Sequence, residues 1–386
     1  MSETYTETSY QSWGGRIKGA IGGILFGLIM FLGSFGLLFW NEGRTVKRTR
    51  VLEEGAASVV TVSTESVDAT NEGKLVHMTG QATTDEVLKD KEFGVSINAI
   101  KLKRVAEMYQ WDEREETKTR KKTGGGTEKK TTYYYNKTWS QYHIDSNGFK
   151  DTSGHENPSS MPYSSEEWTA KDVKVGAYSL SSGLVDEIDN FTGLAVEESQ
   201  IKKLPKSTRK KAKANDGMIY MGRDPVSPEI GDMRISFQAA LPTVVSLVSK
   251  QIKNSFMPYK MEYGFIELLE VGSFSSDEMF RMAQQQNKLI AWAIRAGGFV
   301  VMLIGIFLIF RPLAVMADVL PILGSLLGAG LLIFSTLIAF SLSLLTISIA
   351  WIVYRPLIGI PLLALAVLGI VALAALGLKK RAKTAG

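Results

Sequence analysis

An uninterrupted apolar segment near the amino terminus, residues 20–40, is the feature that most constrains the fold of this chain. An α-helix rises about 1.5 Å per residue, so this segment would extend about 30 Å, the thickness of a bilayer's hydrocarbon core. Arg16 precedes the segment and Trp40 ends it, in positions suited to the two membrane interfaces. The small residues of a signal-peptidase site are absent from its end. The pattern therefore predicts an uncleaved transmembrane span at residues 17–40, preceded by a short tail at residues 1–16.

The carboxyl-terminal part of the chain contains further apolar segments. They predict three more spans, at residues 289–310, 324–350 and 356–378. Residues 311–323 predict a short interfacial segment, because the uncharged stretch that follows is too short for two spans and a turn. Arg355 precedes a proline and predicts a tight turn between the last two spans. Residues 379–386 form a basic tail, and a five-span arrangement also fits the pattern.

Between the first two spans lie residues 41–288, which hold nearly all of the charge and are numerous enough to bury a core. Short stretches rich in β-branched residues indicate strands at 57–62, 75–78, 94–102 and 234–237. The predicted fold is therefore an α-helical four-span membrane bundle, with one amino-terminal and three carboxyl-terminal helices. A large, strand-rich α+β extramembrane domain is inserted between spans 1 and 2.

Local patterns in this domain predict particular elements. Residues 105–111 and 132–142 predict a long hairpin with a mobile tip at 112–130, where charges and glycines dominate. Residues 83–86 and 275–278 both fit the capping box that starts a helix. The second of these predicts a helix that continues into span 2 and couples the domain to the bilayer. Residues 244–256 predict an amphipathic helix.

Composition excludes several classes of site. The chain has no cysteine, which excludes disulfides, thiolate metal ligands and cysteine nucleophiles. Its net charge of +5 is divided among short clusters, and the basic run at 202–213 is typical of a solvated linker. No nucleotide-binding or catalytic-triad motif is present. We therefore predict no nucleic-acid partner, no cofactor and no bound metal.

Two groups of residues in the domain are candidate sites. Residues 154–158 contain His155 beside Asn157, the most enzyme-like group in the chain, although a second metal ligand at a suitable spacing is missing. A hydrolase or metal-dependent enzyme centred on His155 stays an alternative. Trp111, Tyr134 and Trp139 belong to the hairpin strands, where they favour sheet packing over a stacking platform for a ligand.

The membrane segments also contain candidate interaction residues. Gly19, Gly23 and Gly27 recur every four residues and predict a face on which another helix packs closely. Arg295 and Asp318 flank one membrane region, where they either pair across helices or are solvated at the interface. A polar stripe in the third span leaves a channel or transporter as another alternative; its residues are Ser335, Thr336, Ser341, Ser343, Thr346 and Ser348.

The sequence resembles the transmembrane protein 43 family, also called LUMA, over residues 12–378. The resemblance is carried by blocks at 39–44 (FWNEGR), 71–77 (NEGKLVH), 107–111 (EMYQW), 154–159 (GHENPS), 181–186 (SSGLVD), 231–237 (GDMRISF), 343–346 (SLLT) and 354–357 (YRPL). It implies four spans, cytoplasmic termini and an extracytoplasmic middle domain. It brings no established enzymatic activity, and animal members are organisers of membrane-protein complexes. The glycine-rich insert and short basic tail suit a bacterial member.

These observations predict a non-enzymatic scaffold that self-associates and binds other membrane proteins through its lipid-embedded bundle and its domain. The domain is expected to bind a partner or to sense the state of the envelope. For a prokaryotic source we expect the cytoplasmic membrane, and for a eukaryotic source the endoplasmic reticulum or inner nuclear membrane. Charges near the membrane are balanced between the two sides, so the predicted side of the domain rests on the resemblance.

Overall fold

The computed structural model describes residues 3–202, 204, 206–357 and 359–361. The chain divides into two compact units. One, which we call the domain unit, contains residues 3–8, 53–118 and 130–281; the other, the bundle unit, contains residues 9–52, 119–129 and the chain from 282 onward. The first long apolar helix and the hairpin each pass from one unit into the other.

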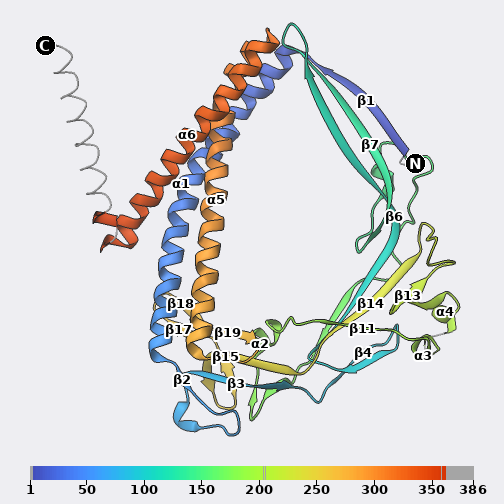
Figure 1. The fold of residues 1–386 in the computed structure, drawn as a ribbon, viewed down its shortest axis with the longest axis vertical. Coiled ribbons are helices and arrows are strands. Elements are labelled where there is room, and N and C mark those ends of the chain that lie inside the picture. Colours follow the sequence, from blue (N-terminus) through green and yellow to red (C-terminus); the bar gives the residue numbers. More distant parts are fainter. Residues whose placement is uncertain (1–2, 203, 205, 358, 362–386) are drawn as a thin grey trace. The chain divides into compact units, whose positions relative to one another are not determined.

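Three long helices dominate the bundle unit: α1 (Trp13–Ser58), α5 (Ser276–Ala317) and α6 (Pro321–Tyr354). Within the described residues, these three are long and apolar enough to cross a membrane. They run side by side (Figure 1) and share a small apolar core in which Leu38 of α1 meets Met302 and Ile306 of α5 and Ala339 of α6. The prediction of one amino-terminal span followed by carboxyl-terminal spans is confirmed for these three helices.

The helix boundaries differ from those predicted. The predicted interfacial segment at 311–323 is wrong, because α5 continues through Pro312 to Ala317. A proline inside a helix removes one backbone hydrogen bond. Packing against neighbouring helices makes this loss tolerable. The chain turns only at residues 318–320, and Pro321 takes the first position of α6, where its missing N–H costs nothing. The predicted fourth span at 356–378 and the tail at 379–386 lie almost wholly outside the described residues.

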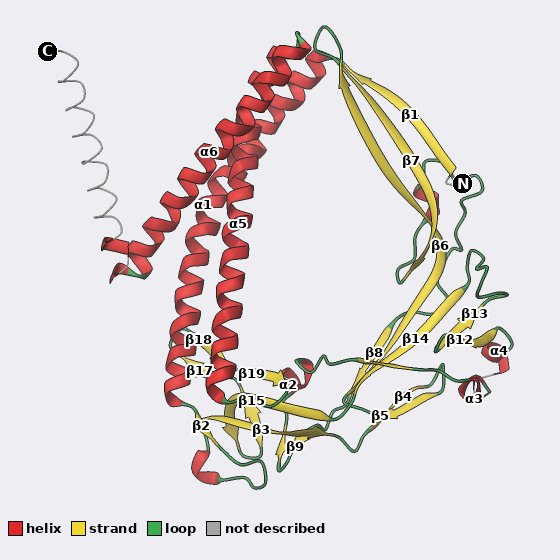
Figure 2. Ribbon diagram, in the orientation of Figure 1, coloured by secondary structure: helices red, strands yellow, loops and turns green. Residues whose placement is uncertain are grey.

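Most of the domain unit is β-structure arranged in two large sheets and two separate hairpins (Figure 2). The first sheet has the order β1 (Glu3–Gln11), β7 (Thr127–Ser140), β6 (Lys101–Lys121), β14 (Met233–Ala240), β13 (Met218–Met221) and β12 (Ala212–Asn215), with β11 (Thr192–Leu194) beside β14 and β8 (Glu166–Thr169) beside β6. The second has the order β10 (Tyr178–Ser179), β9 (Lys174–Val175), β3 (Leu75–Thr83), β15 (Thr243–Ile252) and β16 (Ser255–Met257), with β19 (Leu268–Val271) beside β15 and β2 (Val60–Thr61) beside β3.

The remaining elements are short. The separate hairpins are β4 (Val87–Asp90) with β5 (Val95–Asn98), and β17 (Tyr259–Met261) with β18 (Gly264–Ile266). Helices α2 (Ser182–Asp186), α3 (Glu198–Ile201) and α4 (Lys206–Arg209) lie in the connections. Alternate residues of the strands enter one apolar core, including Leu102 and Met108 of β6 and Phe237 of β14. This period-2 burial confirms the prediction of a strand-rich α+β domain.

Two helix predictions in this unit are wrong. Residues predicted as an amphipathic helix at 244–256 form β15 and β16, because Val244, Val245 and Val248 favour a strand paired on both sides by β3 and β19. The capping-box pattern at 83–86 starts no helix and leads into β4. Its counterpart is confirmed: Ser275 and Glu278 exchange hydrogen bonds at the start of α5.

The long hairpin is confirmed, but its tip is much shorter than predicted. Strands β6 and β7 continue through most of the charged segment at 112–130, so that only residues 122–126 connect them. The threonines and tyrosines of β7 support this extension, since β-branched and aromatic residues favour strands even among charges.

Part of the predicted amino-terminal tail at residues 1–16 has regular structure. Residues 3–11 form β1, which pairs with β7 at the edge of the first sheet. Threonine and tyrosine make up much of this segment, and both favour an edge strand.

Arg104 of β6 lies at the centre of a buried ionic cluster in the domain unit. Its guanidinium donates to Asp90 and Glu92, each at 2.8 Å, and to Glu166 at 3.2 Å. Arg104 and Asp90 are 3% and 1% exposed, so neither charge reaches water if the other is lost.

We expect Arg104→Met to lower the free energy of unfolding by about 3–5 kcal/mol, because it leaves the buried Asp90 carboxylate without its cation. Thermal unfolding of the full chain in detergent measures this. Lys174→Met, which removes the exposed ion pair with Asp172, is the matched control and is expected to leave the midpoint unchanged. Equal midpoints for both variants would contradict the assignment.

His77 of β3 lies where the chain leaves α1 and enters α5. Its Nε2 is 2.9 Å from the Phe274 carbonyl and its Nδ1 is 3.3 Å from the Thr61 hydroxyl. Burial lowers the pKa of His77 below its ordinary value of 6.5, and the contact with Phe274 offsets this only in part.

Since the unfolded chain binds a proton at His77 more readily than the folded chain does, stability should fall as the pH drops below about 6.5. His77→Gln retains hydrogen-bonding capacity without titrating. We expect it to flatten the dependence of the unfolding midpoint on pH between 7 and 5. An unchanged pH profile in this variant would exclude His77 as the cause.

Candidate functional site

A buried polar cluster joins the three long helices where α1 emerges from its apolar segment. Glu42 of α1 is 0% exposed, and its carboxylate accepts two hydrogen bonds from Arg295 of α5, at 2.6 and 2.8 Å. The indole N–H of Trp351 in α6 donates to the same carboxylate at 2.8 Å. A bidentate guanidinium–carboxylate pair fixes both distance and orientation, so this contact sets how the three helices meet.

Aromatic rings surround the ion pair on its other sides. The Arg295 guanidinium lies 4.8 Å from the ring centre of Trp292 and 5.9 Å from that of Trp351. Gly43 allows the Tyr354 ring to approach α1, because a Cβ at this position would lie 2.7 Å from the ring. The exclusion of water by these rings strengthens the charge pairing at the membrane boundary.

One turn further along α1, a second set of polar contacts ties α1 to α5. The amide of Asn287 donates to the carbonyl of Thr45 at 3.0 Å and to the hydroxyl of Thr49 at 3.2 Å, and its oxygen accepts from Arg44 at 3.2 Å. Asn41 donates to the Ala291 carbonyl at 3.1 Å. Both asparagines are buried, so these bonds specify the register between the two helices.

Arg295 and Asp318 do not pair with each other, which was one of the two arrangements considered for them. Arg295 lies within α5 and Asp318 directly follows its last residue, so 23 residues, or about 35 Å of helix, separate them. Helices α1 and α5 run antiparallel, which brings Arg295 to Glu42. Sequence reasoning missed the role of Glu42, although an acid that directly follows a span is the natural partner for an arginine that begins the next one.

At the far end of the bundle unit, Asp318 is the centre of a second ionic cluster. Its carboxylate accepts from Lys121 at 2.5 Å and is paired with Arg16. Burial by itself would raise the pKa of Asp318, but the hydrogen bonds from Lys121 and Arg16 outweigh it and hold the pKa below its ordinary value. The hairpin tip therefore docks on the α5–α6 turn and on the start of α1.

The predicted glycine face of α1 packs within the chain. Gly27 crosses Gly305 of α5 so closely that a Cβ on either residue would lie 2.9 Å or less from the other helix. Gly23 is in ordinary contact with Leu308, whereas Gly19 has no neighbouring atom within 4 Å. Two of the three glycines therefore contact α5.

Arg355 was predicted to form a turn. It follows the last residue of α6, and its backbone N–H donates to the Trp351 carbonyl at 2.7 Å.

His155 is enclosed by the hairpin and its following loop. It is 2% exposed, stacks on Tyr135 at 3.9 Å and meets the edge of Trp111 at 4.7 Å between ring centres. Asn157 bridges segments: it accepts from the Trp111 backbone N–H at 2.7 Å and donates to the Trp111 and Ile144 carbonyls. In the described part of the chain, no three His, Asp or Glu side chains are grouped as metal ligands. This arrangement stabilises the fold and offers no evident reactive group.

The other predicted aromatics lie apart from His155. Trp139 packs on Tyr109 and Tyr220 and beneath the Arg234 guanidinium, 4.7 Å from its ring centre. Tyr134 reaches only Glu116, at 3.3 Å, on the hairpin surface. The sheet-packing role expected for these rings fits the geometry of Trp139.

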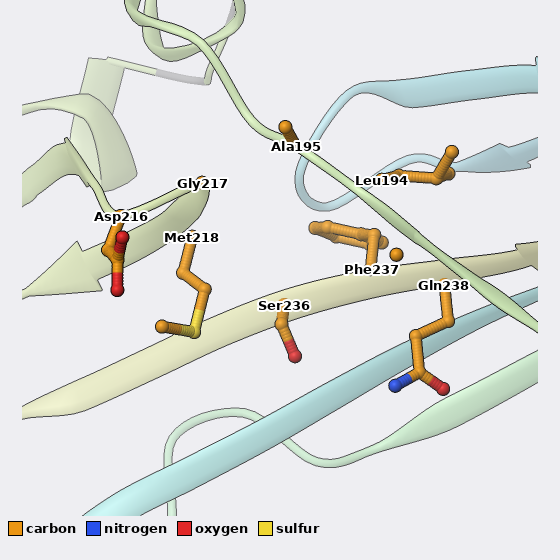
Figure 3. Close-up of a pocket in the computed structure, with 9 residues that line it drawn as sticks. Leu194, Ala195, Asp216, Gly217, Met218, Ser236, Phe237 and Gln238 are labelled. Carbon is orange, nitrogen blue, oxygen red and sulfur yellow. The ribbon is translucent and has the colours of Figure 1, made fainter.

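A pocket of about 330 Å³ lies beside β14 and contains none of the predicted site residues (Figure 3). It forms where β11 and β13, both paired with β14, end on either side of Ser236. Asp216, Ser236 and Gln238 supply polar side chains to it. Asp216 has a positive φ of 50°, which belongs to the tight turn between β12 and β13.

The polar stripe of α6 does not line a common passage. Thr336, Ser341 and Thr346 donate to carbonyls one turn back in their own helix, and Ser343 contacts Met302 of α5. Thr336 and Ser341 face outward, whereas Ser335 is buried. A hydroxyl that donates to a carbonyl of its own helix has a hydrogen-bond partner without a water-filled pore.

Comparison with known proteins identifies the family. The family description "Transmembrane protein 43" matches residues 108–356. Transmembrane protein 43 of Rattus norvegicus is 38% identical over 89% of this chain and 87% of its own length. That of Homo sapiens is 36% identical over 92% and 90%, and the Drosophila melanogaster homologue is 32% identical over 88% and 90%. No solved structure matches the chain. The chain therefore belongs to the transmembrane protein 43 family.

Proposed function

We propose that this protein is a non-enzymatic membrane scaffold that couples a partner-binding or envelope-sensing domain to a helical bundle. The observation that carries the proposal is the Glu42–Arg295–Trp351 cluster. It fixes three membrane helices to one another through a buried ion pair and the hydrogen bond from Trp351 to the same carboxylate. Such a site is suited to positioning helices.

Helix continuity supports the coupling. Helix α1 extends beyond its apolar part to Ser58, and α5 begins at Ser276, well before its own. Within the domain unit, Gly55 of α1 lies so close to Ile266 and Phe280 that a Cβ there would be 2.2 Å from the Ile266 side chain. The helix ends are therefore packed into the domain, so a load on the domain is transmitted along both helices.

Self-association and binding of other membrane proteins are part of the proposal. Gly19, Gly22, Gly33 and Gly36 of α1 have no neighbouring atom within 4 Å of a Cβ position, which leaves room for another helix to approach. The membrane in question is the bacterial cytoplasmic membrane for a prokaryotic source, and the endoplasmic reticulum or inner nuclear membrane for a eukaryotic one. The enzyme and channel alternatives gain no support from His155 or from the stripe on α6.

Removing one member of the ion pair should destabilise the bundle. We expect Glu42→Ala to lower the free energy of unfolding by about 3–5 kcal/mol, because it leaves Arg295 buried without a counter-charge. The double variant Glu42→Leu/Arg295→Met should recover much of this loss, since no charge is then stranded. Unfolding in detergent, followed by tryptophan fluorescence, measures both. Glu53→Ala, which changes an exposed residue of α1, is the control. If the double variant were no more stable than Glu42→Ala, the result would argue against the ion pair.

The scaffold itself is tested by mass and by cross-linking. We expect mass photometry in mild detergent to give multiples of the 42.4 kDa chain, and cross-linking in native membranes to recover membrane proteins with it. Glu42→Ala should reduce that recovery, whereas Glu53→Ala should not. A monomer that captures no protein in native membranes would overturn the scaffold proposal.

A further inference from the structure

One end of the bundle unit carries an excess of positive charge. Glu42 is the only acidic residue in residues 41–52 of α1 and 282–300 of α5. The basic residues of these two stretches are Arg44, Lys47, Arg48, Arg50, Lys288 and Arg295. Glu42 pairs with Arg295, so the two stretches supply no acid to balance the other five basic side chains.

Three of these residues, which we call the basic site, lie at the level of the lipid headgroups: Arg44, Lys47 and Lys288. Arg44 is four residues past Trp40 and Lys288 is four residues before Trp292, so each lies about 6 Å of helix beyond an aromatic ring. Trp40 and Trp292 are 56% and 66% exposed, which suits rings of the interfacial belt. The headgroup layer is about 5–8 Å thick on each side of the hydrocarbon core. Lys47 begins one turn further out, and its long side chain can reach back to this layer.

Contacts between α1 and α5 hold Arg44 in place. Its guanidinium donates to the side-chain oxygen of Asn287 at 3.2 Å and to the Thr45 hydroxyl at 3.5 Å. Asn287 is itself fixed, because its amide donates to the Thr45 carbonyl at 3.0 Å. Lys288 directly follows Asn287, so this contact brings the α5 lysine to the same level of the bundle as Arg44.

The charge of Arg44 is held by neutral groups. Within the described part of the chain, the acceptors of its guanidinium are an amide and a hydroxyl oxygen, and its buried Nε meets no acceptor. A guanidinium has five N–H donors and binds phosphate through pairs of parallel hydrogen bonds. Lys47 and Lys288 are exposed and add two further charges. The basic site therefore offers both directed donors and positive charge to an anion.

We propose that the basic site binds the phosphate of an anionic phospholipid headgroup, with the Arg44 guanidinium as its principal ligand. Leu289 and Trp292, which are 73% and 66% exposed, share a face of α5 with Lys288 and contact the acyl chains of the same lipid. A phospholipid fits better than a soluble anion, because it meets the charges and the apolar side chains together. The proposal rests on the bundle unit alone and goes beyond the scaffold function.

Native mass spectrometry of the full chain tests lipid binding. The chain is reconstituted in nanodiscs of equal parts phosphatidylglycerol and phosphatidylcholine with the same acyl chains, and the lipid retained after release is identified. We expect phosphatidylglycerol to be retained in excess. Lys47→Gln/Lys288→Gln, which changes two exposed residues, should lower this preference by about fivefold for each charge removed. Lys89→Gln, which removes the charge of an exposed lysine in the domain unit, is the matched control and should leave it unchanged.

The role of Arg44 is tested by two variants in the same assay. Arg44→Gln should lower the preference for phosphatidylglycerol, and Arg44→Lys should retain part of it, because lysine keeps the charge but not the paired donors. Equal retention of the two lipids by the unchanged chain would overturn the proposal, and so would an unchanged preference in Lys47→Gln/Lys288→Gln. Complete displacement of phosphatidylglycerol by inorganic phosphate would assign the site to a soluble anion and would overturn it as well. None of these results depends on oligomeric state or partner capture, so the scaffold proposal stands or fails separately.

Discussion

The ion pair between Glu42 and Arg295 is the interaction on which the arrangement of the bundle depends. Glu42 and Arg295 lie near the ends of the apolar parts of two antiparallel helices. The two parallel hydrogen bonds between them fix both the distance and the orientation of the helices at this point. Trp351 extends the same constraint to α6. Around this point the asparagine and threonine contacts align α1 with α5, and the close crossing of Gly27 with Gly305 sets the distance between the helices further along. The polar contacts thus provide specificity where apolar packing alone would permit sliding.

In the family to which the chain belongs, the sequence blocks that carry the resemblance mostly occupy structural positions. Glu42 holds the helices, Asn157 joins the hairpin to its following loop, and Ser181 caps α2 by accepting from the Leu184 N–H at 3.3 Å. Arg234 pairs with Glu107 of the neighbouring strand at 2.5 Å. His155, the residue that most suggests an enzyme in the sequence, is enclosed by aromatic rings. This distribution fits the proposed scaffold role, in which function would depend on holding a shape.

Much of the fold followed from the sequence because its signals are local. Apolar length identified three helices, the Ser275 capping box identified the start of α5, and period-2 patterns identified β3, β14 and the hairpin. Failures arose where a partner distant in sequence decides the structure. Residues 244–256 carry a helical pattern, but pairing with β3 and β19 makes them a strand. Likewise, the choice of Glu42 over Asp318 as partner of Arg295 depends on which ends of two antiparallel helices meet, and the destination of the tail depends on a free sheet edge at β7. No single segment contains that information.

The contact between Gly43 and Tyr354 limits how this assembly can move. The Tyr354 ring occupies the space that a side chain at position 43 would fill, and Trp351 lies one turn earlier on the same helix, held by Glu42. Sliding α6 along α1 by one helical turn, about 5.4 Å, would place the ring against a residue with a Cβ and break the indole hydrogen bond at the same time. These two contacts therefore oppose a shift of α6 along α1 by one helical turn. They do not oppose a rotation of α6 about the contact in the same way. A change in the angle between α1 and α6 is therefore easier than a shift of one helix along the other.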